Sequence, residues 1–190
     1  MHEDISKLIE VCNSIYDRQL VSGRSGNVSI KLGDYIAITP TFKPINGLNE
    51  KDIVLVDMDG NSLTKGKPSS EVGMHLGIYK KREDVNAIIH THSPYATGFS
   101  FNYEKLEILE DYCKFYKTNL SSVDFEEPGS KELALKASKN IIDNDALILK
   151  NHGPLCVGKT LKETESLAIF IEEAAKTKFI SIMLNSVKDI

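Results

Sequence analysis

Residues 87–96 read AIIHTHSPYA, and they place His90 and His92 one residue apart at the end of a short apolar run. Such a run, followed by turn-forming residues, predicts a buried β-strand. In a strand, residues i and i+2 project from the same face about 7 Å apart, so two imidazoles can converge on one metal ion. The pair alone is a weak signal, because most isolated histidine pairs are hydrogen-bonding residues, and both interpretations stay open here.

Apolar spacing outward from this strand predicts helices mixed with short strands, in one domain that spans residues 1–190. Helices are expected at 3–20, 69–82, 103–120, 128–142 with Ser130 as N-cap, and 161–184. Strands are expected as a hairpin within 26–40, within 52–63, within 84–92, and as two strands around a turn within 145–158. Hairpins combined with helices of this length predict an α/β sandwich whose sheet is largely antiparallel.

The composition, 41% hydrophobic and 26% charged, is that of a globular protein without an apolar stretch near the roughly 20 residues that span a bilayer. The acidic start MHEDISKLIE lacks signal-peptide features. The three cysteines, Cys12, Cys113 and Cys156, have no paired spacing, which predicts reduced thiols and a cytoplasmic protein. With a net charge of −4, scattered basic residues and no tryptophan, we expect no nucleic-acid and no membrane partner.

His152 lies in LILKNHGPL, residues 147–155, in a turn that follows an apolar strand. Loops at strand ends often carry functional side chains, although a turn histidine that bonds to its own backbone explains this pattern as well. Of the other histidines, His2 lies at a terminus that frays, and His75 is expected on a helix surface. Three neutral imidazoles with one open position form the usual arrangement of a catalytic zinc ion.

Glu71 lies in GKPSSEVGMH, residues 66–75, where Ser69 and Ser70 stand at N-cap positions and Glu71 falls in the first helical turn. The helix dipole favours an anion there, so Glu71 is either a stabilising surface charge or a proton-transfer group. A phosphate could use the same free N–H groups. The segment SGRSGNVS, residues 22–29, either cradles a phosphate or makes a tight turn, and it matches no nucleotide-binding pattern.

Several segments, in order from about residue 5 to about 180, together resemble the class II aldolase family. They are SGRSGNVS, ITPT, KPSSE, HLGIYKKREDVNAIIHTHSPYA, and LKNHGPLCVG followed by a long helix containing EEAAK. The family includes fuculose-phosphate aldolases, ribulose-phosphate 4-epimerases and adducin head domains. The resemblance implies a three-layer α/β/α fold with an antiparallel central sheet, and a homotetramer with active sites at subunit interfaces. It also implies one zinc ion per subunit, a site that another divalent ion could occupy.

The resemblance also implies roles for individual residues. Glu71 matches the acid/base, which contacts the zinc ion before substrate binds, and Phe42 stands where the family often has glycine. The implied zinc ligands are His90, His92 and His152. The implied phosphate-binding residues are Asn27, Thr41, Ser69 and Ser70, with Arg24 as a further charged contact. Tyr112 is the candidate for a catalytic tyrosine that family members donate across a subunit interface.

The implied activity is that of a zinc-dependent aldolase acting on a small phosphorylated sugar. It would reversibly cleave a ketose 1-phosphate such as fuculose 1-phosphate into dihydroxyacetone phosphate and an aldehyde, through a metal-stabilised enediolate. Glutamate at position 71 favours aldol chemistry, because the similar epimerases usually have aspartate there. The same residues would also suit a methylthioribulose-phosphate dehydratase, a 4-epimerase or a decarboxylase. Two alternatives come from other classes: a non-catalytic scaffold of the adducin-head type, against which the full set of histidines with Glu71 argues, and a structural zinc module, against which the lack of clustered cysteines argues.

Overall fold

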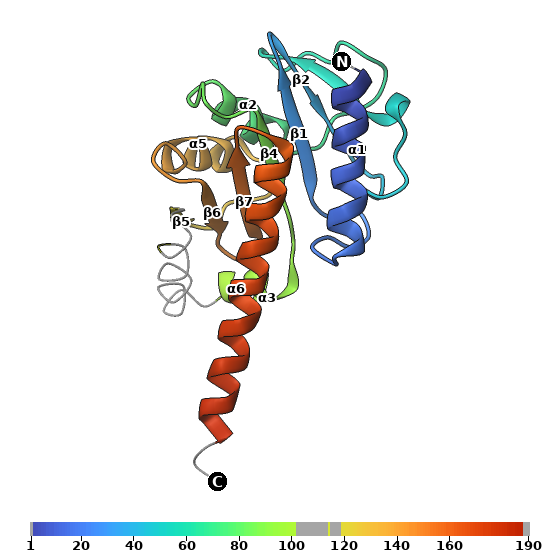
Figure 1. The fold of residues 1–190 in the computed structure, drawn as a ribbon. Helices are drawn as coiled ribbons and strands as arrows, with labels where there is room; N and C mark the ends of the chain where they lie inside the picture. The colour runs from blue at the N-terminus through green and yellow to red at the C-terminus, as the bar shows by residue number, and fades with distance from the viewer. Residues whose placement is uncertain (1, 102–113, 115–118, 188–190) are drawn as a thin grey trace.

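The computed structural model describes residues 2–101, 114 and 119–187. Its strands form one sheet, and its helices pack against that sheet (Figure 1). The helices are α1 (His2–Asp17), the 3-10 helix η1 (Glu50–Asp52), α2 (Val72–Tyr79), α3 (Pro94–Ser100), α5 (Lys131–Asn140) and α6 (Leu161–Val187). The strands are β1 (Asn27–Leu32), β2 (Tyr35–Ile38), β3 (Val54–Asp57), β4 (Ala87–His90), β5 (Leu120–Val123), β6 (Ala146–Leu149) and β7 (Gly153–Gly158).

The strands in the described part of the chain form a seven-stranded sheet in the order β3-β2-β1-β4-β7-β6-β5. All neighbouring pairs are antiparallel except β5 and β6, which run parallel with Leu120 opposite Ala146. Helix α5 connects these two strands as a crossover, and a crossover returns the chain to the same end of the sheet. The sheet is therefore mixed, which corrects the expected largely antiparallel sheet at its β5 edge.

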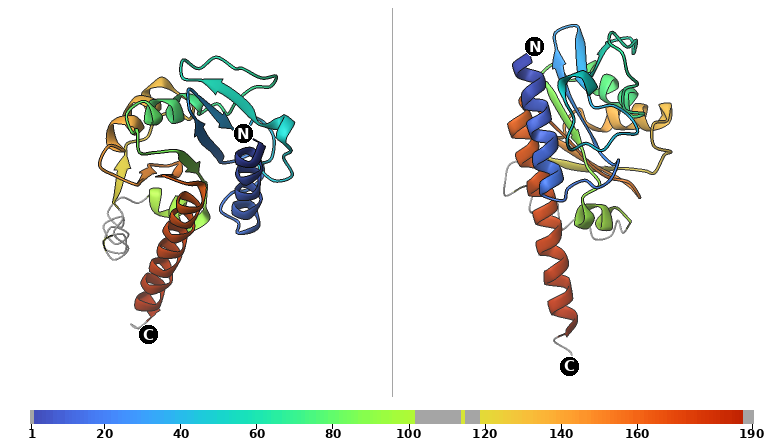
Figure 2. Two further views of the ribbon diagram at one scale, coloured as in Figure 1. Left: turned by 45° about the horizontal axis from the view of Figure 1, so that its top comes forward. Right: turned by 90° about the vertical axis from the view of Figure 1, so that its right-hand side faces the viewer.

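Two apolar cores lie on opposite faces of the sheet. Helices α1, α3 and α6 contribute to one core, whereas α2 and α5 contribute to the other (Figure 2). Neighbouring residues of β4 divide between them, because Ile89 belongs to the first core and Ile88 to the second. Strands covered on both faces have continuous apolar sequences, which is why residues 87–89 show no polar alternation.

Most of the predicted helices are present, with shifted ends. The first helix ends at Asp17 and not at residue 20, because Gln19 adopts a left-handed φ of 61° and the Leu20 N–H donates to the Ile15 carbonyl at 2.9 Å. Ser130 is the N-cap of α5, as predicted, and its hydroxyl accepts from the Leu133 N–H at 3.0 Å. Helix α6 is the predicted last helix, and its C-terminal half extends beyond the sheet (Figures 1 and 2).

Three elements were not predicted: the 3-10 helix η1, helix α3 and strand β5. Helix α3 begins at Pro94, two residues after His92, and Pro94 at its first turn was an available signal for it. Strand β5 begins at Leu120, the last residue of the helix expected at 103–120, and the rest of that range lies almost entirely outside the described residues. Among the described helices, none is both long and apolar enough to cross a bilayer.

Candidate metal and active site

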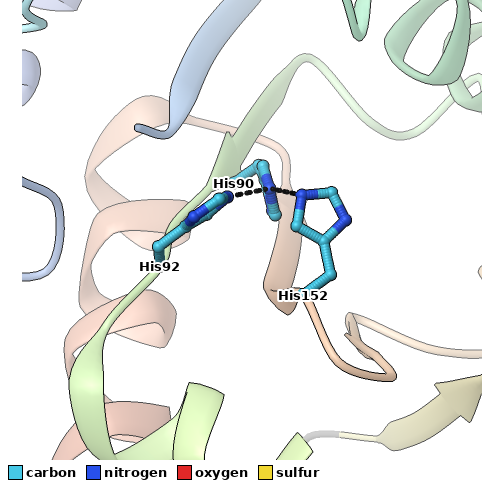
Figure 3. A group of neighbouring side chains, drawn as sticks. All are labelled: His90, His92 and His152. Carbon is cyan, nitrogen blue, oxygen red and sulfur yellow. Dashed lines mark hydrogen bonds between the residues drawn. The ribbon is translucent and has the colours of Figure 1, made fainter. Parts of the chain in front are cut away.

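The two histidines of the quoted stretch lie at one end of β4, beside the turn that carries His152 (Figure 3). His90 is the last residue of β4, and His92 follows two residues later. Strand β7 pairs with β4, so the β6–β7 turn lies next to this end. Gly153 permits the close approach, since a Cβ there would lie 2.4 Å from the Thr91 carbonyl oxygen. The backbone contact brings three imidazoles together from two separate segments.

The three rings turn their Nε2 atoms toward one another (Figure 3). The Nε2 atom of His90 lies 3.1 Å from that of His92 and 3.2 Å from that of His152. Nitrogen ligands at the usual zinc distance in a tetrahedral site are about 3.3 Å apart. The observed spacing therefore fits three ligands of one ion.

The hydrogen bonds of His90 show what this arrangement lacks. Its Nδ1 lies 2.9 Å from the Pro154 carbonyl oxygen, so Nδ1–H is the donor and Nε2 of the neutral ring carries a lone pair. That lone pair faces two other imidazoles, and the Glu71 Oε2 atom, also an acceptor, lies 3.3 Å away. One lone pair cannot accept from both rings, and an ionised carboxylate donates no hydrogen bond. A divalent cation between these atoms would satisfy all of them.

Burial keeps these imidazoles neutral. Loss of hydration lowers the pKa of His90 to about 3, with a further contribution from His92. Burial also lowers the pKa of His152 to about 3 and shifts that of His92 downward. The neutral imidazole is the form that binds a metal ion, so the cluster is ready to coordinate at pH 7.

Glu71, the residue immediately before α2, directs its side chain toward the histidines. Its side chain is buried, and its Oε1 atom lies 3.6 Å from His152 Nε2 without any hydrogen bond. Glu71 is itself the N-cap residue, which corrects its expected place in the first helical turn. The hydroxyls of Ser69 and Ser70 do not cap the helix either. Ser69 begins a turn in which its carbonyl oxygen accepts from the Val72 N–H, and its Oγ atom accepts from the Glu71 N–H at 3.3 Å.

His75 is not on the helix surface, as the sequence had suggested, but fully buried between α2 and β1. Its Nε2 lies 2.6 Å from Asn27 Oδ1, and its Nδ1 lies 2.7 Å from Ser29 Oγ. The Asn27 amide in turn donates to Glu71 Oε2 at 2.8 Å. Residues four apart in a helix share a face, so the spacing from Glu71 to His75 was an available signal.

The residues expected to bind phosphate come from three segments, and those of Thr41 and of Ser69 and Ser70 are joined by backbone hydrogen bonds. Thr41 donates its N–H to the Lys67 carbonyl, and Ser69 donates its N–H to the Thr39 carbonyl, both at 3.0 Å. Ser69 is buried, Thr41 is half-buried, and Ser70 is exposed. Asn27 is also buried, with its amide held by Glu71. The structure thus brings Asn27 and Ser69 into contact with Glu71.

The remaining predicted residues are less closely associated with Glu71. Arg24 is exposed in the loop before β1, and within the described part of the chain no hydrogen bond or ion pair joins it to Glu71. Phe42 is 70% exposed, with Lys67 Nζ 5.7 Å from its ring centroid. Its φ of 62° lies in the left-handed region that glycine adopts most easily. Tyr112 lies outside the described residues.

Comparisons with known proteins show the family of this chain. The family described as class II aldolase and adducin N-terminal domain matches residues 6–179. An L-fuculose phosphate aldolase of Methanocaldococcus jannaschii is 42% identical over 181 residues, which cover 95% of this chain and 98% of that protein. A 3-oxo-tetronate 4-phosphate decarboxylase of Haemophilus influenzae is 31% identical over 178 residues, or 90% and 85% of the two chains.

A solved structure of an L-fuculose 1-phosphate aldolase has the same fold, with a TM-score of 0.84 and 28% identity. The superposition covers 97% of this chain and 88% of the other. The family match and the L-fuculose phosphate aldolase relatives identify an enzyme of the lyase class. This chain belongs to the class II aldolase and adducin N-terminal domain family.

Proposed function

We propose that this protein is a zinc-dependent aldolase that reversibly cleaves a ketose 1-phosphate, of the L-fuculose 1-phosphate type, into dihydroxyacetone phosphate and an aldehyde. The observation that carries the proposal is the buried Glu71 carboxylate facing His90, His92 and His152. Similarity to L-fuculose phosphate aldolases supports the choice of substrate. Aldol chemistry needs a base beside a centre that stabilises negative charge. Glu71 would be the base, and a cation held by the three histidines would be that centre.

Glu71 is the group that moves the proton in this proposal. It takes a proton from the carbon next to the ketone of dihydroxyacetone phosphate during synthesis, and it returns the proton to that carbon after cleavage. Its Oε1 atom is buried and makes no hydrogen bond, so it is free to hold the proton. An ion bound by the three histidines supplies a Lewis acid that stabilises negative charge on the substrate.

The substrate phosphate binds beside Glu71 in this proposal. Its partners are Asn27, Thr41, Ser69 and Ser70, with Arg24 as an outer charged contact. Tyr112 would protonate the aldehyde oxygen, and it would come from a neighbouring subunit of a homotetramer. We further propose that residues 1–190 act as a single three-layer domain in the cytoplasm.

A decarboxylase of an oxo-acid sugar phosphate is the second candidate. The relative from Haemophilus influenzae, 31% identical along most of both chains, favours decarboxylation over dehydration or 4-epimerisation. Aldol cleavage and decarboxylation both pass through negative charge next to a ketone, so the same residues could serve either reaction. Release of carbon dioxide from 3-oxo-tetronate 4-phosphate, without cleavage of L-fuculose 1-phosphate, would favour decarboxylation.

The first test combines metal analysis with an activity assay. We expect close to one zinc ion per chain, and release of dihydroxyacetone phosphate from L-fuculose 1-phosphate that a chelator abolishes and added zinc restores. Bound zinc without release would reject the aldolase activity and leave the metal site intact. Activity unaffected by complete removal of metal would reject the metal-dependent mechanism.

The second test removes the proton-transfer group. Glu71→Gln should retain zinc and lower kcat by about 10²–10⁴-fold, the usual contribution of general acid–base catalysis. Glu172→Gln is the matched control, because Glu172 is another buried carboxylate, at 7% exposed against 5%, and accepts backbone N–H groups of α3. A Glu71→Gln variant with the wild-type kcat would remove Glu71 from the mechanism.

A further inference from the structure

We infer that His75 is a positioning residue, which holds the amide of Asn27 so that Asn27 fixes one oxygen of Glu71 and leaves the other free for proton transfer. Four side chains carry this inference, and they form one buried line from β1 through α2 to the histidine cluster. They are Ser29, His75, Asn27 and Glu71. The inference rests on the proposed role of Glu71 and extends it to residues that make no contact with the reacting atoms.

The direction of each hydrogen bond follows from the carboxylate. An ionised carboxylate only accepts, so the NH₂ group of Asn27 faces Glu71 Oε2 at 2.8 Å. The Asn27 oxygen then faces His75 Nε2 at 2.6 Å, which makes Nε2 the protonated nitrogen. His75 Nδ1 is therefore an acceptor, and it receives the Ser29 hydroxyl at 2.7 Å. A single tautomer of His75 satisfies the whole line.

His75 is itself held firmly, which qualifies it to orient another residue. Its side chain is fully buried, and the Ser29 hydroxyl that donates to it also lies 2.8 Å from the Tyr79 hydroxyl. Tyr79 is one helical turn further along α2, and it donates to the Ser29 carbonyl at 3.1 Å. These contacts join α2 to β1, so the side chain of His75 has no room for another rotamer.

The consequence concerns the two oxygens of Glu71. Oε2 is occupied by the Asn27 amide, whereas Oε1 is buried without a hydrogen bond and lies 3.6 Å from His152 Nε2. Without the His75 donor, the Asn27 oxygen would lose its partner, and the Asn27 side chain, held by Glu71 alone, could adopt other rotamers. Glu71 Oε2 would then lose its fixed donor, and the carboxylate could move away from the substrate. Correct placement of Glu71 thus depends on the hydrogen bond between His75 and Asn27, in which Glu71 itself takes no part.

The kinetic test separates the donor of His75 from its bulk. His75→Phe keeps the ring but removes both nitrogens, and it should lower kcat about 10–100-fold with little change in bound metal. His75→Gln places an NH₂ group near the position of Nε2, and it should recover most of kcat. Ile78→Val, also fully buried on α2, is the control for general loosening of the helix, and it should keep the wild-type kcat.

A double-mutant cycle tests whether His75 acts through Asn27. If it does, His75→Phe should cost much less in kcat in an Asn27→Ala background than in the wild type, because the residue it orients is already missing. Equal losses in the two backgrounds would overturn the inference. So would a wild-type kcat in His75→Phe, or a His75→Gln variant no more active than His75→Phe.

A spectroscopic measurement keeps the inference testable if the substrate proposal fails. Nitrogen-15 spectra of protein labelled at histidine should show His75 as the Nε2–H tautomer with Nδ1 unprotonated. Asn27→Ala should perturb the Nε2 signal of His75, whereas Ile78→Val should leave it unchanged. The Nδ1–H tautomer would overturn the inference whatever reaction the enzyme catalyses, and absence of aldolase activity alone would reject only the proposed function.

Discussion

The polar side chains at the two ends of β4 differ in whether they have hydrogen-bond partners within the protein. Where the chain enters the strand, Arg82 donates through Nη1 to the carbonyl oxygens of Ile141, Ile142 and Asn144 at 2.6–3.1 Å, and through Nε and Nη2 to Asp84. These bonds close the C-terminal end of α5. Every guanidinium nitrogen at this end has a partner inside the protein.

Where the chain leaves β4, buried side-chain atoms lack partners. In the described part of the chain, those without a hydrogen bond are Glu71 Oε1, Thr91 Oγ1, Ser93 Oγ, Thr97 Oγ1 and His152 Nδ1. An unpaired buried polar atom costs about 1–3 kcal/mol of stability. Such a concentration at one end of one strand is expected of a site whose partners arrive with an ion and a substrate. We therefore expect the Arg82 end to contribute to stability and the histidine end to carry the proposed chemistry.

The largest expected effect is at the histidine end. His92→Ala should lose bound zinc and activity together, by two orders of magnitude or more, because even the partners of metal ligands are worth about 10–100-fold. After a chelator has removed the metal from both proteins, the free energy of unfolding of the variant should stay within about 1 kcal/mol of that of the wild type, since His92 contributes little to either core. Metal analysis, kinetics and urea unfolding test this. A variant that still binds one equivalent of zinc tightly would contradict the ligand assignment.

The opposite result is expected at the other end. Arg82→Met keeps the apolar stem but leaves three carbonyl oxygens without their donor, so it should lower the free energy of unfolding by about 2 kcal/mol. Below its unfolding temperature it should keep the kcat and metal content of the wild type. Lys80→Met, at an exposed position of the same segment, is the control and should change stability by less than about 0.5 kcal/mol. Loss of kcat in folded Arg82→Met would show that the Arg82 end also contributes to catalysis.

The smallest expected effect is the pH dependence that His75 gives to the free energy of unfolding between about pH 6 and 5. Burial lowers the pKa of His75 to about 3, below the value of about 6.5 in an unfolded chain, so the unfolded state binds the extra proton between these pH values. The contribution of neutral His75 to the free energy of unfolding is therefore fully present above about pH 6.5, and it is lost by about 1.4 kcal/mol per pH unit as the pH falls toward 3.

His75→Gln removes this contribution while the other buried histidines remain. Its free energy of unfolding, measured in urea with a chelator present, should consequently decline less steeply than that of the wild type between about pH 6 and 5. Parallel pH profiles for the two proteins would show that His75 does not stay neutral in the folded state, and would weaken the tautomer assigned to it.

The predicted elements show how far local sequence patterns reach. Apolar and turn patterns correctly predicted α1, α2, α5 and α6, strand β3 and the strands of both hairpins. Helix α1 buries one periodic face, whereas β6 is buried throughout and stands out as a continuous apolar run. The quoted stretch predicted a strand that ends in a histidine pair, and β4 ends at His90. Helix α3, the 3-10 helix η1 and strand β5 were missed, because α3 and η1 are short and β5, LSSV, has no apolar run like those of the predicted strands.

The residues alone predicted which side chains are chemically suitable, and the family resemblance selected His152 and Glu71 from them. Only the tertiary structure decided how they meet: Gly153 lets the β6–β7 turn touch Thr91, and β4–β7 pairing brings the His152 ring to His90. The surroundings of His75 were likewise decided by packing. Its helical position indicates a face, but burial against β1 determines whether that face meets solvent or Asn27, because burial depends on segments far apart in the chain.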